Sequence, residues 1–311
     1  MLIIFKKVIY IYLILGLNIY FCSYFLSKIS ARTELRRGYV AARAGGFGRP
    51  FASIFKYMSK EHRLSVWEML LFFFSFFIWT VIPFSQSLII IKFDFDIIAV
   101  ILFYLVLVFL IIINACSSSY GFIYNNFSRK ILMMFTFFIP LLFCIASIVL
   151  ISRTLNLKEI VGSQYQYWNI IFQPLGFIAA VTSVVMQLKM LGLTGKNPIL
   201  YSETAEKEGA GFGRLVNRTA EYSIMFFLIV IIVLLYLAGW ERFFLINGNV
   251  MFGIKFYVVF FLLLFIDKAT PKLNDFYYLK SVNFKFVIPI SVINFLLTMV
   301  FFILRNIYNL I

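Results

Sequence analysis

The sequence predicts an all-α fold: a polytopic membrane helix bundle with eight transmembrane helices and one amphipathic interfacial helix. The first observation is composition, because 63% hydrophobic residues, 13% charged residues and a mean hydropathy of +0.96 lie outside the soluble range. The second is the length of the apolar stretches, since a helix needs about 20 residues to cross roughly 30 Å of hydrocarbon. The third is the lack of the polar and apolar alternation of transmembrane β-strands. We treat residues 1–311 as a single integral membrane domain.

Eight stretches are long and apolar enough to span a membrane: 8–26, 65–91, 97–116, 131–152, 168–188, 222–240, 250–266 and 286–304. The first follows Lys6 and Lys7 but is too long for a signal peptide and lacks a cleavage site, so we interpret it as a retained helix. Four prolines fall inside these ranges, as in many membrane bundles: Pro83, Pro140, Pro174 and Pro289. Lys255 is expected near the bilayer midplane.

Basic residues indicate the topology. Twenty of the 28 lysines and arginines lie in four connections: 28–63, 117–131, 189–220 and 267–285. Short basic loops stay on the side from which the protein is inserted, so these four share one side. The net charge of +15 can meet anionic lipids such as cardiolipin or an acidic protein surface. No soluble recognition module accompanies the charge, which argues against a nucleic-acid partner.

Metal and catalytic sites are not expected within this chain. Cys22, Cys116 and Cys144 are separated along apolar stretches and are interpreted as packing residues. The single histidine, His62, sits at a membrane boundary and is interpreted as a solvated residue. Asp94 and Asp96 form a D-x-D in a short connection on the sparsely charged side, where a polar turn explains them.

The connection 27–64 is basic and Gly-rich and contains a helical pattern after Pro50. Its apolar residues recur at i, i+3, i+4 and i+7: Phe51, Ile54, Phe55 and Met58. Polar residues take the opposite side: Ser53, Lys56 and Lys60. This pattern predicts a helix lying in the interface plane. A simple lipid-surface anchor satisfies it equally well.

The connection 189–221, between the fifth and sixth predicted helices, is unusually acidic. It holds four of the chain's 13 acidic residues: Glu203, Glu206, Glu208 and Glu221. A solvated loop of mixed charge accounts for this composition. Alternatively, the carboxylates form an acidic funnel at the membrane boundary, where close carboxylates have shifted pKa values and can pass protons.

These residues resemble membrane subunit 1 of NADH:ubiquinone oxidoreductase, respiratory complex I. In the first connection nine residues match that family in register: Arg36, Arg37, Gly38, Gly46, Pro50, Ala52, Lys56, Lys60 and Glu61. In the second, six match with wider spacing: Pro198, Glu203, Glu206, Glu208, Glu221 and Tyr222. Six more resemble the family's last basic loop: Lys268, Pro271, Lys272, Asp275, Lys285 and Pro289.

The resemblance implies a core membrane subunit of an H⁺-translocating NADH:ubiquinone reductase. Such a subunit forms the ubiquinone-access chamber and couples quinone reduction to proton translocation. Residues expected at the quinone chamber are Arg36, Arg37, Phe51, Lys56 and Lys272. Residues expected in proton coupling are Glu203, Glu206, Glu208, Glu221 and Tyr222. The resemblance implies no catalytic residue, metal or redox centre in this chain.

The resemblance also implies cofactors, partners and a location. Ubiquinone is the substrate, no cofactor is covalently bound, and FMN and iron–sulfur clusters belong to partner subunits. The partners are other complex I subunits, especially the quinone-site subunits of the peripheral arm and the adjacent small membrane subunits. The many Phe (40) and Tyr (18) residues, with Ile, Asn and Lys, are what an A/T-rich organellar gene gives. We therefore expect a mitochondrially encoded protein of the inner mitochondrial membrane.

Departures from the family pattern predict a divergent member. Ser53, Leu26 and Leu200 stand where the family has acidic residues, and no acidic residue lies between Asp96 and Glu159. Intramembrane carboxylates are usually kept for function, so the proton path is expected to be rerouted, shortened or passed to neighbouring subunits. The main alternative is a proton-linked secondary transporter, which would also have helices interrupted by proline. A third is a lipid-modifying enzyme, for which His62 alone is a poor candidate.

Overall fold

The computed structural model describes residues 2–33, 35, 46–60, 64–85, 88–91, 93–117, 124–191, 211–241, 247–270 and 276–307. Within these ranges the regular secondary structure is helical throughout, which confirms the all-α prediction. The α-helices are α1 (Leu2–Thr33), α2 (Arg49–Met58), α3 (Val66–Phe77), α4 (Asp96–Ser117), α5 (Tyr124–Ser152), α6 (Leu157–Ser163), α7 (Asn169–Phe172), α8 (Pro174–Met190), α10 (Phe212–Tyr236), α11 (Gly248–Ala269), α12 (Phe276–Val282) and α13 (Ile288–Ile307). A 3₁₀ turn, η2 (Ile78–Thr80), extends α3, and a π-helical segment, η4 (Asn283–Val287), joins α12 to α13.

Six helical segments of the described chain are long and apolar enough to cross a membrane, so the chain is a multi-pass membrane protein: Phe5–Thr33, Asp96–Asn114, Leu132–Ser152, Phe212–Tyr236, Gly248–Ala269 and Tyr277–Arg305. Two apolar helices, Val66–Thr80 and Pro174–Met190, are shorter. The prediction of eight full-length spans is therefore met by six. The interruptions explain the difference.

Proline chemistry shortens both of the remaining spans. The helix predicted over 65–91 ends at Thr80, and Pro83 lies beyond it, so the amide of Ile91 returns to the carbonyl of Thr80 at 3.1 Å. The helix predicted over 168–188 is divided at Gln173, whose φ and ψ of −131° and 61° are not helical. A residue that precedes proline is pushed out of the α region, and Pro174 then begins α8.

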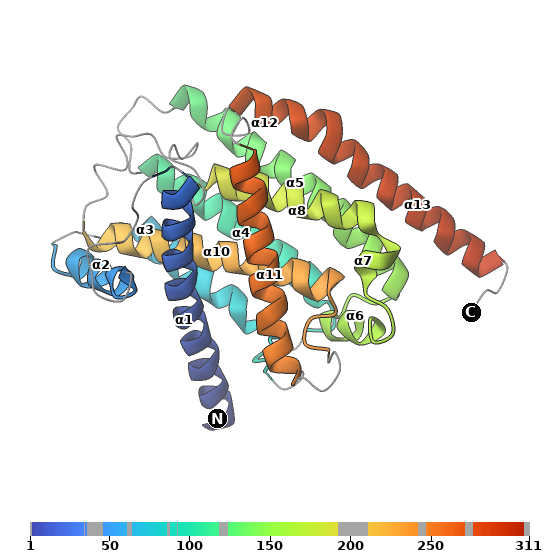
Figure 1. Cartoon of the computed structure of the whole chain (residues 1–311), viewed down its shortest axis with the longest axis horizontal. Helices are drawn as coiled ribbons and strands as arrows, with labels where there is room; N and C mark the ends of the chain where they lie inside the picture. The colour runs from blue at the N-terminus through green and yellow to red at the C-terminus, as the bar shows by residue number, and fades with distance from the viewer. Residues whose placement is uncertain are drawn as a thin grey trace.

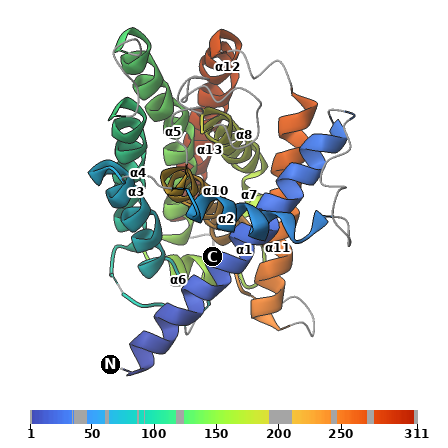
Figure 2. The same cartoon turned by 90° about the vertical axis from the view of Figure 1, so that its left-hand side faces the viewer.

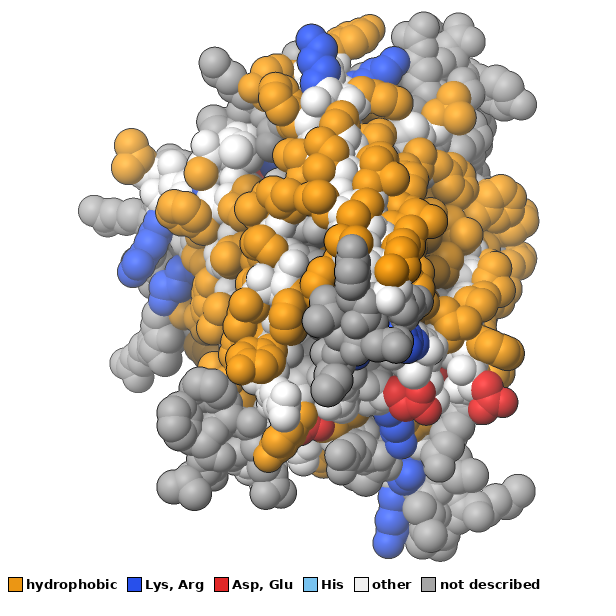
Figure 3. Space-filling view, turned by 90° about the vertical axis from the view of Figure 1, so that its right-hand side faces the viewer, with side chains coloured by type: hydrophobic (Ala, Val, Ile, Leu, Met, Phe, Trp, Pro, Cys, Tyr) orange, Lys and Arg blue, Asp and Glu red, His pale blue; other side chains and the backbone are white. Residues whose placement is uncertain are grey.

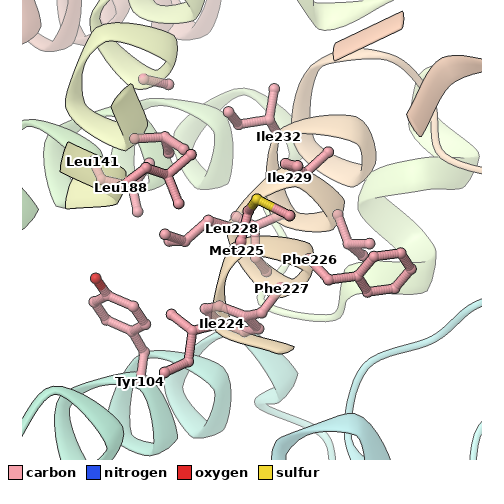
Figure 4. Close-up of a cluster of buried hydrophobic side chains, with 14 of the residues drawn as sticks. Tyr104, Leu141, Leu188, Ile224, Met225, Phe226, Phe227, Leu228, Ile229 and Ile232 are labelled. Carbon is pink, nitrogen blue, oxygen red and sulfur yellow. The ribbon is translucent and has the colours of Figure 1, made fainter. Parts of the chain in front are cut away.

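The helices surround α10, which is buried along most of its length. It packs against α3, α11 and α8 and also contacts α1, α2 and α6, and Figure 2 shows it end-on in the middle of the bundle. A second group is formed by α5, α8 and α13, which lie side by side in Figure 1. In the core close-up, Tyr104, Leu141 and Leu188 from three helices surround the side chains of α10 (Figure 4).

The bundle has two chemically distinct ends. At the first, which we call the basic end, Asn217 of α10 contacts Glu68 near the start of α3 and Asn114 near the end of α4. At the same end Lys189 joins the last turns of α8 and α11. These contacts place the four basic connections together, as the topology predicts. In Figure 1 both marked chain ends lie away from α12 and this end.

The opposite end gathers the amino terminus and the sparsely charged connections. Lys7 donates to the carbonyl of Ile89 at 3.4 Å. Lys255 donates to the carbonyls of Gly239 and Glu241, at 3.1 and 3.3 Å, and its ammonium lies 4.9 Å from the centre of the Trp168 ring. The expectation of a lysine near the midplane is thus wrong, because the flexible side chain reaches the carbonyls that follow α10.

Candidate functional site

Helix α2 lies on the surface of the basic end, against α10 and α1. Its apolar residues Phe51, Ile54, Phe55 and Met58 are exposed, while Pro50 is buried. Lys56 is also exposed. The helix therefore turns its predicted apolar face away from the rest of the chain, toward lipid or a partner. The guanidinium of Arg214 lies 5.8 Å from the centre of the Tyr57 ring and links α10 to the inner side of α2.

Aromatic side chains fix the segment before α2 to α1. The Phe47 ring lies 5.3 Å from the rings of Tyr20 and Tyr24 and 5.9 Å from that of Phe21. The hydroxyl of Tyr20 donates to the carbonyl of Phe47. Edge-on aromatic contacts of this kind add to simple area burial. The entry to α2 is thus held in one place beside an apolar surface.

Glu68 is a buried carboxylate at this end, with 7% of its surface exposed. It closes a capping box with Ser65, in which Glu68 N donates to Ser65 Oγ at 3.2 Å and Ser65 N donates to Glu68 Oε2 at 3.0 Å. Its other oxygen accepts from Asn217 Nδ2 at 3.4 Å. Asn217 Oδ1 in turn accepts from Asn114 Nδ2 at 2.8 Å. This chain of polar groups links α3, α10 and α4.

Glu221 lies one helical turn beyond Asn217 on α10 and is 8% exposed. Tyr222 follows it and packs partly buried against the core. Ser223, the next residue, accepts from Trp79 Nε1 at 2.7 Å and donates to the carbonyl of Ser75 at 2.8 Å. The polar start of α10 is therefore helical and tied to α3. This explains why the helix begins at Phe212 rather than at the predicted residue 222.

Lys189 and Asp267 form a buried ion pair at the same end. Their side chains are 2% and 4% exposed, and Lys189 Nζ lies 3.2 Å from Asp267 Oδ1. The ammonium also donates to the carbonyls of Asp267 and Thr270, at 3.3 and 2.9 Å. A cation is favourable at these last carbonyls of α11 because of the helix dipole. Lys268 lies 3.5 Å from the other Asp267 oxygen.

The structure places four of the predicted site residues: Phe51 and Lys56 on α2, and Glu221 and Tyr222 on α10. Because α2 contacts α10, the two predicted groups belong to one end of the bundle. The remaining predicted residues lie outside the described part of the chain: Arg36, Arg37, Glu203, Glu206, Glu208 and Lys272. His62 also lies outside it.

Sequence reasoning missed Glu68, Asn114 and the Lys189–Asp267 pair. Ser65 and Glu68 do fit the S-x-x-E pattern of a capping box, which was the available signal. The other contacts join residues 78 or more positions apart and leave no local pattern. Among the described residues, no group of three His, Cys, Asp or Glu side chains is arranged to hold a metal ion. Cys22 and Cys144 are buried thiols.

Comparison with known proteins gives consistent matches. A family model described as "NADH dehydrogenase" matches residues 6–299. The chain is 30% identical over 180 residues to a membrane protein of Bacillus cytotoxicus that is named as a subunit of NADH-quinone oxidoreductase, a match that covers 55% of this chain and 52% of the relative. Proteins of the same name from Bacillus cereus (strain B4264) and Bacillus thuringiensis (strain Al Hakam) are 29% identical with the same coverage. The chain spans about half the length of the curated relatives it matches.

Proposed function

The chain belongs to the NADH dehydrogenase family, and from this premise we propose that it is the quinone-facing membrane subunit of an NADH-quinone oxidoreductase. In this role it forms the ubiquinone-access chamber and couples quinone reduction to proton translocation. The observation that carries the proposal is the basic end of the bundle. There the surface helix α2 lies against α10, which carries the buried Glu221 and binds the buried Glu68.

The quinone chamber needs an apolar corridor that opens into the bilayer, because the quinone tail is a hydrocarbon. The aromatic cluster of Tyr20, Tyr24 and Phe47 supports such a corridor beside α1, and the exposed Phe51 and Phe55 extend the aromatic surface along α2. Cations near the headgroup stabilise negative charge as the quinone is reduced. We assign this role to Arg36, Arg37, Lys56 and Lys272.

Proton coupling is assigned to the carboxylates of the same end. Glu203, Glu206, Glu208, Glu221 and Tyr222 sense the charge on the quinone and bias proton movement toward neighbouring subunits. Glu68 joins this set, because it is buried and bonded to α10. A buried carboxylate is expensive to keep in a membrane protein and is usually retained for function.

The same proposal specifies the surroundings of the chain. It holds no redox centre, and electrons reach ubiquinone from FMN and iron–sulfur clusters in partner subunits. The partners are the quinone-site subunits of the peripheral arm, the adjacent small membrane subunits and lipids such as cardiolipin. We propose that Val66–Thr80 and Pro174–Met190 also cross the membrane, which completes eight spans. The location is the inner mitochondrial membrane, and finding the gene on a bacterial chromosome would contradict that location.

Assembly is tested by extraction in mild detergent, native gel separation and mass spectrometry of the proteins that migrate with this chain. The expected result is a large NADH-oxidising assembly with flavin- and iron–sulfur-containing subunits. A small homo-oligomer without redox partners would overturn the proposal in favour of a secondary transporter.

Coupling is tested separately with Glu221→Gln, which keeps the shape of the side chain and removes its charge. We expect NADH:ubiquinone turnover to fall about tenfold or more, since a positioned acid or base contributes at least that much. NADH oxidation by an artificial acceptor in the peripheral arm should not change. Glu241→Gln, at the opposite end, is the matched control. Equal loss of both activities in Glu221→Gln would argue against a coupling role.

A further inference from the structure

The end of the bundle opposite the quinone site has a groove of its own, with a volume of about 690 Å³. It lies among the turn before α4, the last turn of α5, the loop that leads to α6, and α13. These helices begin or end there, so the groove sits at the membrane boundary. Its volume is typical of small-molecule sites.

The groove combines charged and apolar walls. Asp94, Arg153 and Glu159 supply two carboxylates and one guanidinium, and all three residues are exposed. Phe95 and Phe302 stand on the apolar side, with Phe95 60% exposed. Figure 3 shows acidic and basic side chains next to one another at the edge of the broad apolar surface on this side of the molecule. Charges of both signs therefore meet the hydrocarbon boundary at one place.

Arg153 is held in a conformation that a non-glycine residue rarely adopts, with φ at +58°. Its amide still closes the last turn of α5 by donating to the carbonyl of Val149 at 2.8 Å. The guanidinium carbon lies 5.0 Å from the centre of the Phe302 ring on α13. A left-handed arginine costs roughly 1–2 kcal/mol and persists only where its surroundings fix it. Here that fixed geometry keeps the cation at the groove.

We propose that this groove binds the headgroup of an aminophospholipid, with its phosphate on Arg153 and its primary ammonium on Asp94 and Glu159. The acyl chains then run along the apolar side, past Phe95 and Phe302. A choline headgroup has the same charges but lacks the N–H donors that carboxylates require. A purely anionic headgroup would meet two carboxylates and one cation. The inference is independent of the function proposed for the basic end.

The test uses the full-length chain equilibrated in vesicles of equal parts phosphatidylethanolamine, phosphatidylcholine and phosphatidylglycerol. After extraction in mild detergent, mass spectrometry counts the lipids retained per chain. The wild type should retain phosphatidylethanolamine over phosphatidylcholine by about tenfold, the effect of one charge-assisted hydrogen bond. Arg153→Gln and Glu159→Gln should remove that preference. Arg305→Gln, one turn beyond Phe302 on α13 and outside the groove, should retain it.

A second measurement needs no substitution and so does not depend on folding of a variant. Phosphatidylethanolamine carrying one, two or three N-methyl groups should be retained progressively less, with the largest loss when the last N–H disappears. Equal retention of the trimethylated lipid would overturn the proposal. So would a preference for phosphatidylglycerol, or a preference for phosphatidylethanolamine that survives both groove substitutions.

Discussion

The basic end of the bundle and its interior bury polar side chains with different chemistry. At the basic end the buried groups are ionisable: Glu68, Lys189, Glu221 and Asp267. Between α4, α5, α8 and α13 they are neutral: Tyr104, Ser147, Gln173, Gln187 and Asn294. An ionisable group can change its charge when its surroundings change, whereas an amide cannot. The contrast assigns charge-responsive work to one end and structural specificity to the interior.

The interior contacts form two separate clusters. In one, the hydroxyl of Tyr104 donates to Gln187 Oε1, and Gln187 Nε2 donates to the carbonyl of Phe137 at 3.2 Å. In the other, Asn294 Oδ1 accepts from the amide of Gly176 at 3.1 Å, and Asn294 Nδ2 donates to Ser147 Oγ at 3.2 Å. Each cluster joins three helices, because a buried polar group in hydrocarbon must find a partner.

The largest loss of stability is expected from breaking the buried ion pair. Lys189→Met leaves Asp267 buried with only Lys268 beside it and should lower the free energy of unfolding in detergent by about 3 kcal/mol. Lys189→Met combined with Asp267→Leu should recover much of the loss, since no buried charge remains. Arg214→Met, on the surface side of α10, is the matched control. Equal stabilities of the single and double variants would break the proposed contrast.

Asn294→Leu tests a neutral interior contact of similar depth. Gly176 lies in the first turn of α8, where its amide has no helical acceptor, so removing Asn294 leaves that donor buried and unpaired. We expect a loss of about 2 kcal/mol in the free energy of unfolding. Met299→Leu, at an exposed position on the same helix, should change it little. A fall in turnover without loss of stability would contradict the structural role of the interior.

Tyr104→Phe removes one interior hydroxyl and keeps the ring that stacks on Phe138 and Phe227. The loss of one hydrogen bond should cost about 1 kcal/mol of stability. NADH:ubiquinone turnover, measured in the assembled complex, should not change. Lower turnover at unchanged stability would show that the interior takes part in coupling.

Glu68→Gln should show the opposite pattern and the smallest loss of stability. The amide can still accept from Ser65 and Asn217, so the free energy of unfolding should change by less than about 1 kcal/mol. Turnover with ubiquinone should fall severalfold because the side chain no longer carries charge. Glu159→Gln, an exposed carboxylate at the opposite end, controls for loss of a single negative charge. Unchanged turnover in Glu68→Gln would remove Glu68 from the coupling set.

Local sequence patterns predicted the helices whose ends are set by local chemistry. The stretch 97–116 corresponds to Asp96–Ser117, and the amphipathic pattern after Pro50 corresponds to Arg49–Met58. The start of α10 was not predictable in this way, because its polar residues resemble a loop until Asn217 and Ser223 are seen bonded to other helices. Hydropathy likewise marked 168–188 as one span, although Pro174 divides it.

The same distinction holds for the candidate site. The helical spacing of Phe51 and Ile54 is a local property, and it correctly indicated the surface helix. The Lys189–Asp267 pair joins the ends of two helices, and nothing within either helix specifies its partner. Glu68 was overlooked because it begins a strongly apolar stretch, where a cap explains its presence and its contact with Asn217 is invisible.

The enclosure of α10 has a consequence for biosynthesis. Of its neighbours, α3 and α8 leave the ribosome before it, whereas α11 leaves after it. A nascent chain that has just inserted α10 therefore still exposes part of its Phe226 surface, which the mature protein covers with Phe256 of α11 at 4.4 Å between ring centroids. Chains stalled before Gly248 should be preferred substrates of membrane quality-control proteases, and protection should begin once α11 has entered the bilayer.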